Sequence, residues 1–295
     1  HQKNLKFEGK INMTISNNPK YLEGYIDNNS LEEANFNWFK DAKLGLFIHY
    51  GLYSINGYNA FEQWLKKIHV KEYEKLKEKF TAKNFDADYI TDLALKAGMK
   101  YVTFVAKHCE GFCLWDTKET DFNSVNSAAK RDLVAEIAEA CQEKGLGLFL
   151  FYEHGFDWRH PHGPRRLHYP FRLTEVPYEE VETHYAYGDD YNLQNYVNYV
   201  YNQIKELLTN YGPIAGIWLD GFAVPNNGDK KQFKLTGLYK MIRDTQSQAL
   251  ISYKKGIEGS EDFLAIEETW LDQDLNLDRF VEICAPLQSG WSYEE

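Results

Sequence analysis

The sequence lacks several features that would point to common classes of protein. No run of about 18 or more apolar residues occurs, so the sequence predicts no membrane-spanning helix. The nucleotide-binding patterns G-x-G-x-x-G and G-x-x-x-x-G-K-[ST] are missing, which disfavours a doubly wound nucleotide-binding fold. Cysteine is scarce, and Cys109, Cys113, Cys141 and Cys284 have neither the spacing of a zinc site nor the density of a disulfide framework.

The chain also has fewer basic than acidic residues. Lysine and arginine total 33 against 44 aspartate and glutamate residues, which gives a formal net charge of -11. Nucleic acids and anionic membrane surfaces bind basic faces, so we expect neither as a partner. The chain opens with the polar stretch HQKNLKFEGK, in which no signal peptide is visible. A mature N-terminus from which a signal peptide had been removed would look the same. What the sequence has in abundance is aromatic residues, at 16%.

The apolar residues gather in short runs, and each run ends abruptly at a polar or ionisable residue. Such runs, rich in β-branched and aromatic residues, are typical of strands buried on both faces of a parallel sheet. The runs are Leu44–Ile48 before His49, Tyr101–Ala106 before Lys107 and His108, Leu146–Phe151 before Tyr152 and Glu153, Ile214–Leu219 before Asp220, Ala249–Tyr253 before Lys254, and Phe263–Ile266 before Glu267 and Glu268.

Helical patterns separate these runs. Apolar residues at helical spacing predict helices over about Asp86–Ala97, over Lys130–Lys144 and from Leu193 to Leu207. Alternating strands and helices predict a TIM-like (β/α) barrel, incomplete or irregular at its C-terminal end because the sequence stops soon after the sixth run. We assign residues 1–36 to an N-terminal extension and residues 37–295 to the catalytic barrel, and we expect no C-terminal β-sandwich domain within this chain.

The residues that end the runs are candidates for a shared site. In a parallel barrel the loops at the carboxyl ends of the strands converge on the active site. We therefore expect one cavity to contain His49, His108, Glu153, Asp220, Lys254 and Glu267. Asp220 stands out, because a carboxylate after a buried run and before Gly221 can act as a nucleophile or a metal ligand. It can equally be a helix N-cap, and spacing alone does not decide between these roles.

Several separate segments between Trp38 and about Tyr293 carry the motifs of one known family. They are WFKDAKLGLFIHYG, AGMKYVTFVAKHCEGFCLWDTKETDFN, KRDLVAEIAEACQEKGLGLFLFY, FDWRHP and YGPIAGIWLDG. In these motifs the chain resembles the retaining α-L-fucosidases of glycoside hydrolase family 29. The resemblance implies an exo-acting enzyme that releases α-L-fucose, or a closely related L-sugar, from glycans. The implied mechanism is a double displacement in which two carboxyl groups about 5–5.5 Å apart flank the glycosidic bond.

The resemblance assigns catalytic roles to two carboxyl groups. Asp220, in YGPIAGIWLDG, matches the family nucleophile that forms the covalent glycosyl intermediate. Glu267, in EDFLAIEE, matches the position of the acid/base, and we prefer it because it ends a predicted strand. Two alternatives stay open, namely Asp262 in the same element and Glu282 in VEICAPLQSGWSY.

The resemblance also implies a set of substrate-binding residues. His49 and His108 match histidines that hydrogen-bond sugar hydroxyls, since a neutral imidazole supplies both a donor and an acceptor. Tryptophans in the loops suit the apolar faces of a sugar, and Trp64 matches such a residue beside Glu62 or Gln63. The full expected set is His49, Glu62, Trp64, His108, Cys109, Tyr152 and Trp218.

The sequence departs from the family pattern at neighbouring points. His108 is followed by Cys109 where the family usually has a second histidine, and Glu110 then stands in place of the family's aspartate. The residues after Tyr152 are Glu153, His154 and Gly155, where serine is common. A thiol is a weak donor to a hydroxyl, so a related sugar such as L-galactose or an unusual aglycone stays open. Two other functions remain as alternatives. One is a catalytically inactive carbohydrate-binding barrel, and the other is a metal-dependent barrel hydrolase that uses His49, His108 and Asp220.

The remaining expectations concern partners and location. We expect a fucosylated oligosaccharide or glycoconjugate as the substrate, no cofactor and no metal, since the H-E-x-x-H pattern is missing. No nucleic acid partner and no membrane span are expected. The resemblance implies a secreted, periplasmic or lysosomal-type location, and the sequence does not indicate an oligomeric state.

Overall fold

The computed structural model describes residues 19–27, 29–165, 174–177, 182–221, 224, 230–267, 279–287 and 290–291, and every structural statement below concerns these residues. Part of the sequence interpretation therefore lies outside the described residues. This part comprises residues 1–18 of the expected N-terminal extension, Glu268 at the end of the sixth run, and Tyr293.

Parallel strands form the centre of the molecule. Five of them hydrogen-bond side by side in chain order: β1 (Gly45–Ile48), β2 (Tyr101–Lys107), β3 (Gly147–Glu153), β4 (Gly216–Asp220) and β5 (Leu250–Tyr253). A second parallel pair, β6 (Leu264–Glu267) and β7 (Val281–Cys284), is joined to β5 by a bridge between Ser252 and Phe263. The six predicted runs are thus confirmed as β1 to β6. Strand β7 was not predicted, because its residues are mostly half-buried or exposed and form no continuous apolar run.

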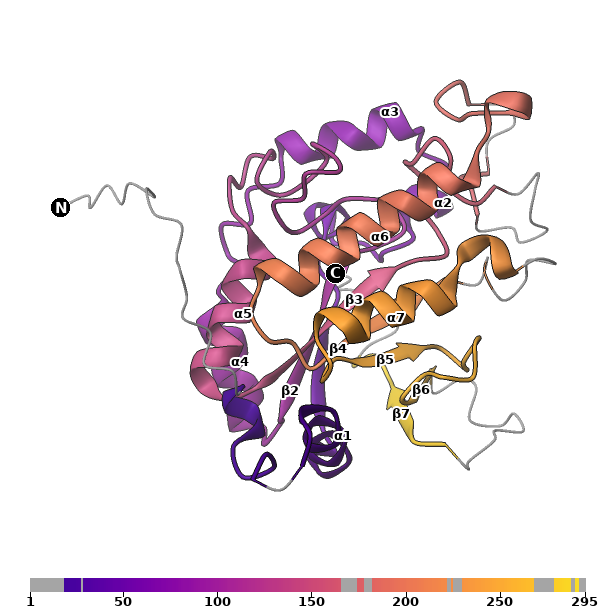
Figure 1. Cartoon of the computed structure of the whole chain (residues 1–295). Helices are drawn as coiled ribbons and strands as arrows, with labels where there is room; N and C mark the ends of the chain where they lie inside the picture. The colour runs from indigo at the N-terminus through magenta and orange to yellow at the C-terminus, as the bar shows by residue number, and fades with distance from the viewer. Residues whose placement is uncertain are drawn as a thin grey trace.

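Helices cover the outside of the strands, as Figure 1 shows. The α-helices are α1 (Leu31–Ala42), α2 (Glu62–Leu65), α3 (Val70–Tyr73), α4 (Ala87–Lys96), α5 (Leu133–Lys144), α6 (Leu193–Asn210) and α7 (Leu235–Thr245). Short 3-10 helices are η1 (Lys20–Leu22), η2 (Leu52–Ile55), η3 (Glu74–Glu78), η4 (Gly188–Asp190) and η5 (Lys230–Phe233). Within the described residues, no helix has the length and apolar character needed to cross a membrane.

The three predicted helices are confirmed, with one shifted start. Helix α4 begins after Asp86, whose side chain accepts a hydrogen bond from the Tyr89 amide at 2.9 Å, as an N-cap does. Helix α5 begins after Asp132 rather than at Lys130, because Lys130 has a φ of 55° in the left-handed region and cannot be part of a right-handed helix. Helix α7 was missed, since no side chain caps its start.

Helix α1 closes the end of the barrel that lies opposite the carboxyl ends of the strands. Its capping box pairs Ser30 with Glu33. On its buried face, Asn35 donates to the carbonyl oxygens of Ala215 at 2.8 Å and Gln248 at 2.6 Å, just before β4 and β5. The boundary predicted between residues 36 and 37 falls inside this helix.

The barrel is open between its first and last strands. In the part of the chain that the structure describes, β1 and β7 are the outer strands, and no strand pairing joins them. A groove of about 730 Å³ lies between them and is lined by both strands. The fold is therefore an incomplete TIM-like α/β barrel, as the sequence predicts.

Candidate active site

A pocket of about 110 Å³ lies at the carboxyl ends of the strands. Its polar lining consists of the residues that end the predicted runs: His49, His108, Glu153, Asp220, Lys254 and Glu267. Its apolar lining consists of Phe47, Phe61, Phe151, Phe156, Trp218, Cys284 and Trp291. The expectation that these six ionisable residues open into one cavity is confirmed, because parallel strands carry their carboxyl ends to the same side.

Lys254 links two carboxyl groups in this pocket. Its Nζ lies 3.0 Å from Asp220 Oδ2 and also pairs with Glu267 Oε1. Asp220 ends β4 and Glu267 ends β6, while Lys254 directly follows β5 between them. The ammonium group also lies 5.2 Å from the centre of the Trp218 ring. A single ammonium group therefore contacts both carboxylates.

The charges within this group shift one another's protonation. Burial raises the pKa of Asp220, while the Lys254 ammonium and the Gly221 amide act in the opposite direction. The Gly221 amide donates to Asp220 Oδ1 at 2.6 Å. Burial by itself lowers the pKa of Lys254, but the neighbouring carboxylates of Asp220 and Glu267 outweigh it and hold that pKa above its ordinary value. Lys254 is therefore charged at neutral pH, which favours the ionised form of Asp220.

The structure separates the three candidates for the acid/base. Asp262 is held by Arg243, at 3.1 Å, and by the Ile251 amide at 2.7 Å. Glu282 accepts one hydrogen bond from the Tyr101 hydroxyl and one from Trp218 Nε1, each at 2.8 Å. Both carboxyl groups are thus engaged away from the pocket. Of the three, the pocket lining contains Glu267 alone.

Two neutral histidines form another wall. The rings of His49 and His108 lie 5.6 Å apart, and His108 stacks on Phe151 with an interplanar angle of 11°. Burial, together with the charge of Lys254, lowers the pKa of His49 to about 3. Burial also lowers the pKa of His108 well below its ordinary value. Both imidazoles are uncharged at neutral pH, so each offers one donor and one acceptor.

The sequence interpretation assigned no role to Glu153 beyond its place at the end of a run. The register of β3 against β4 pairs Glu153 with Asp220. Its carboxyl group is buried, and Oε2 accepts a weak hydrogen bond from the Cys109 thiol at 3.5 Å. Burial raises the pKa of Glu153, and the nearby charge of Asp220 raises it further. The sequence could have indicated Glu153, because it follows Tyr152 on a predicted strand and successive side chains of a strand point to opposite faces.

Tyr152, expected to bind the sugar, lies outside the described pocket lining. Successive side chains of a strand point to opposite faces, so Phe151 and Glu153 face the pocket while Tyr152 faces the outer layer. There its hydroxyl donates to Gln203 Oε1 of α6 at 2.7 Å. Tyr152 thus packs between strand and helix and is withdrawn from the pocket.

Three further members of the expected sugar-binding set also lie outside the described pocket lining. Glu62 is buried in α2, where it accepts hydrogen bonds from Asn56 at 2.9 Å and Lys66 at 2.8 Å. Trp64 packs on the apolar cluster that contains Cys109. Cys109 itself is fully buried behind Glu153. Trp218, by contrast, lines the pocket together with the two histidines.

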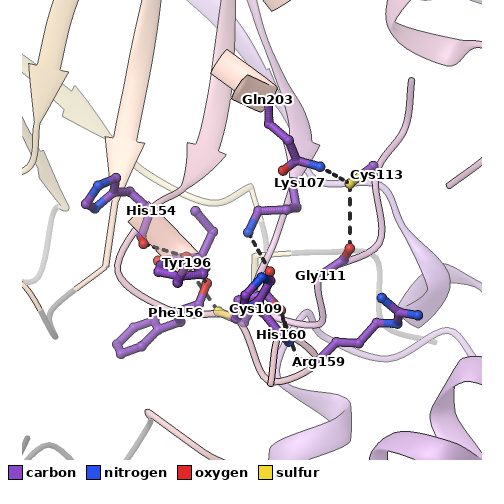
Figure 2. A network of polar contacts seen from close by, with 12 residues as sticks. Lys107, Cys109, Gly111, Cys113, His154, Phe156, Arg159, His160, Tyr196 and Gln203 are labelled. Atoms are coloured by element: carbon purple, nitrogen blue, oxygen red, sulfur yellow. Dashed lines mark hydrogen bonds and ion pairs between the residues drawn. The ribbon is translucent and has the colours of Figure 1, made fainter. Parts of the chain in front are cut away.

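The loops that follow β2 and β3 are tied to each other, as Figure 2 shows. A buried ion pair of 2.8 Å joins Lys107 Nζ to Asp157 Oδ2. The Trp158 amide donates to the Cys109 carbonyl oxygen at 2.8 Å, and the Tyr196 hydroxyl donates to the His154 carbonyl oxygen at 2.6 Å. These contacts fix the backbone on both sides of Glu153 and Cys109.

A metal could in principle use part of the same site. Within the described residues, one group of potential ligands comes together, formed by His108, Cys109 and Glu153. Its ligand atoms lie within 4.8 Å of one another, and all three residues are buried. An imidazole, a thiolate and a carboxylate are the ligands that zinc accepts. The set differs from the His49, His108 and Asp220 combination considered from the sequence.

The fold and the pocket define the class of the protein, which is an α/β barrel with its polar groups at the carboxyl ends of the strands, as in barrel enzymes. The chain belongs to the α-L-fucosidase family. The family model described as Alpha-L-fucosidase matches residues 13–295, which is most of the chain.

Individual relatives agree with this membership. The chain is 29% identical to Alpha-L-fucosidase of Dictyostelium discoideum over 207 residues, covering 62% of this chain and 41% of the relative. Among solved structures, Alpha-L-fucosidase isoenzyme 1 from Paenibacillus thiaminolyticus has a TM-score of 0.77 at 32% identity, covering 90% of this chain and 63% of that one. AlfC from Lactobacillus casei, in complex with its α-L-fucose product, has a TM-score of 0.72 at 30% identity, covering 84% of this chain and 78% of that one. The chain thus spans less than half the length of this curated relative.

Proposed function

We propose that the protein is a retaining, exo-acting α-L-fucosidase. The observation that carries the proposal is the pair of carboxyl groups, Asp220 and Glu267, held by Lys254 in one pocket. A retaining glycosidase needs two carboxyl groups on either side of the glycosidic bond. A small pocket closed by aromatic side chains suits one terminal sugar rather than an internal unit of a polymer.

In the proposed reaction Asp220 is the nucleophile. Its carboxylate attacks the anomeric carbon while the bond to the leaving oxygen breaks and Glu267 gives that oxygen a proton. Glu267, now ionised, then takes a proton from water, and the water oxygen attacks the anomeric carbon and releases Asp220. His49 and His108 hydrogen-bond hydroxyl groups of the sugar, and the Trp218 ring contacts its apolar face.

The substrate and the location belong to the same proposal. We propose an α-L-fucoside of an oligosaccharide or glycoconjugate as the substrate. One of the solved neighbours is a mutant of AlfC in complex with Fucα(1,6)GlcNAc, which supports a glycan substrate. A secreted, periplasmic or lysosomal-type location suits such a substrate, because glycans of this kind are displayed outside the cytosol.

The test compares four aryl glycosides, those of α-L-fucose, α-L-galactose, α-L-rhamnose and β-D-galactose. We expect the protein to prefer the α-L-fucoside, and Asp220→Gly to reduce turnover by about three orders of magnitude or more. Azide should rescue Asp220→Gly and give a glycosyl azide of inverted configuration. With Glu267→Ala, azide should give the retained configuration, because Asp220 still forms the glycosyl intermediate.

Two outcomes would contradict the proposal. If the unmodified protein binds L-fucose but turns over none of the four glycosides, it is a binding protein rather than an enzyme. If Asp262→Ala, the matched control outside the pocket, loses turnover that azide restores while Glu267→Ala does not, the acid/base is assigned wrongly. Circular dichroism of each variant shows that it is folded.

A further inference from the structure

Glu153 is a third carboxyl group in the pocket, and the two-carboxylate mechanism does not use it. Its side chain is 2% exposed, and it lines the pocket together with Asp220 and Glu267. Among the described residues, its Oε1 has no hydrogen-bond partner. A buried polar atom without a partner is unfavourable, because it has lost its hydrogen bonds to water. A ligand atom that hydrogen-bonds Oε1 would remove this cost, so the atom is suited to contact the substrate.

The backbone leaves room for this carboxyl group beside the nucleophile. Glu153 and Asp220 occupy paired register positions on β3 and β4. A Cβ atom at Gly221 would lie 2.5 Å from Glu153 Oε1 and 2.3 Å from the Gly155 backbone nitrogen. Gly221 also has a φ of 119°, which side chains other than glycine rarely adopt. Glycine at this position therefore makes the space that Oε1 occupies.

The other side of the carboxyl group is fixed by the protein. Oε2 accepts from the Cys109 thiol at 3.5 Å, and the carbonyl oxygen of Cys109 accepts from the Trp158 amide at 2.8 Å. Cys109 and Glu153 are two positions at which the sequence departs from the family pattern, and the structure brings them into contact. The thiol that stands in place of the second histidine thus holds the carboxyl group of Glu153.

The cations near the pocket are paired with other carboxylates. Lys107 pairs with Asp157 at 2.8 Å, and Lys254 pairs with Asp220 and Glu267. Within the described residues, Glu153 has no ion pair. Its Oε1 is therefore free of any cation of the described residues and can hydrogen-bond a ligand.

We propose that Glu153 is a specificity-determining residue whose Oε1 hydrogen-bonds the hydroxyl group on the carbon next to the anomeric carbon, the 2-OH of the sugar. The proposal rests on the proposed function, because the nucleophile Asp220 fixes where the anomeric carbon lies. A carboxyl group beside Asp220 reaches the substituents next to that carbon. The ring oxygen on one side can only accept a hydrogen bond, whereas the 2-OH on the other side can donate as well as accept and so pairs with Oε1 in either protonation state of Glu153. Hydrogen bonds to the 2-OH strengthen in the transition state of glycoside cleavage.

The experiment combines a change in the protein with a change in the substrate. It compares kcat/KM for an aryl α-L-fucoside and its 2-deoxy analogue in the unmodified protein, in Glu153→Ala and in Glu153→Gln. In the unmodified protein the ratio of the two values contains the contribution of the 2-OH contact. We expect this ratio to fall about 10- to 100-fold in Glu153→Ala, because the contact is then already lost. The intrinsic reactivity of the 2-deoxy sugar cancels in this comparison.

Controls locate the effect on one hydroxyl and one residue. The same comparison with the 3-deoxy and 4-deoxy fucosides should leave the ratio unchanged. The ratio should also be unchanged in Glu282→Gln, a half-buried glutamate outside the pocket lining. An unchanged 2-deoxy ratio in both Glu153 variants, or a change confined to the 3-deoxy or 4-deoxy substrate, overturns the proposal.

Repeating the assays with EDTA and with added zinc distinguishes a metal-binding role of Glu153 from a hydrogen bond to the 2-OH. If EDTA abolishes turnover and zinc restores it only while Glu153 is present, then Glu153 is a metal ligand and the proposal is wrong. If the unmodified protein shows no turnover, the proposed function fails on its own. The same comparison is then made on the affinities for L-fucose and 2-deoxy-L-fucose by calorimetry, where equal ratios in the unmodified protein and Glu153→Ala overturn the inference.

Discussion

At the scale of single residues, the chemistry of the pocket depends on how the Lys254 ammonium is shared. Its contacts with Asp220 and Glu267 join the ends of β4 and β6 through a residue that follows β5. Neither carboxylate has such a contact with a second lysine or arginine in the described part of the chain. Burial raises the pKa of the proposed nucleophile Asp220, and the Lys254 ammonium opposes this rise and so favours the ionised form.

Lys254→Met should change the pH dependence of activity. Loss of the ammonium removes the interaction that lowers the pKa of Asp220, so this pKa rises. A nucleophile must be ionised, and we therefore expect the acidic limb of the kcat/KM profile to move to higher pH. The measurement is kcat/KM for the aryl fucoside across the acidic and neutral range, with Lys254→Arg as the matched control that keeps the charge. A limb that stays in place in Lys254→Met would show that Lys254 does not govern the ionisation of Asp220.

At the scale of elements, helix α1 fixes the end of the barrel away from the pocket. The buried Asn35 donates to one carbonyl before β4 and to another before β5. Beside it, the Phe39 ring lies 5.1 Å from Phe149 and 4.7 Å from Phe263, on β3 and at the start of β6. The helix therefore ties together strands whose opposite ends carry Glu153, Asp220 and Glu267.

Asn35→Ala should reduce stability without changing the chemistry. Two buried carbonyl oxygens each lose one hydrogen bond, so we expect the free energy of unfolding to fall by about 1–3 kcal/mol. Urea unfolding measures this change. Asn37→Ala, on a half-buried position of the same helix, is the matched control and should change it by less than about 0.5 kcal/mol. The folded Asn35→Ala protein should keep its kcat/KM, and a large loss there would mean that α1 also shapes the pocket.

At the scale of the whole molecule, burial holds ionisable groups in their neutral forms. Burial raises the pKa of Glu110 to about 8 and lowers the pKa of His49 and His154 to about 3. Unfolding exposes these groups and returns them to ordinary pKa values. The histidines make folding less favourable as the pH falls below about 6.5, because only the unfolded chain then binds their protons. Glu110 acts in the opposite sense, since the folded state holds a proton that the unfolded chain has released.

The contribution of Glu110 can be isolated by substitution. It is fully present below the ordinary glutamate pKa and is lost as the pH rises toward about 8. The stability that Glu110 contributes should therefore decline over this range by up to about 1.4 kcal/mol per pH unit, while the two histidines act in the opposite sense below about pH 6.5. Glu110→Gln does not titrate and should remove that part of the slope. Urea unfolding at several pH values measures it, and equal slopes in both proteins would contradict the assignment.

Much of the fold was predictable because strands buried on both faces appear as continuous apolar runs. All residues of β2 and β3 are buried, and their ends were placed within two residues. Strand β7 could not be recognised in this way, since Ile283 is 55% exposed beside the open groove. Helix α7 contains a glycine, Gly237, and begins without a side-chain cap, so its start carries no local signal.

By itself, the sequence determined which ionisable residues meet in the pocket, because the topology of a parallel barrel brings the carboxyl ends of its strands together. Only the tertiary structure decided which of the candidate carboxyl groups and strand residues line the pocket. Hydrogen bonds outside the pocket engage Asp262 and Glu282 and leave Glu267 in the lining. The alternation of β3 turns Tyr152 outward and Glu153 inward. Contacts such as that of Glu153 with Cys109 join distant positions in the chain, and no local pattern records them.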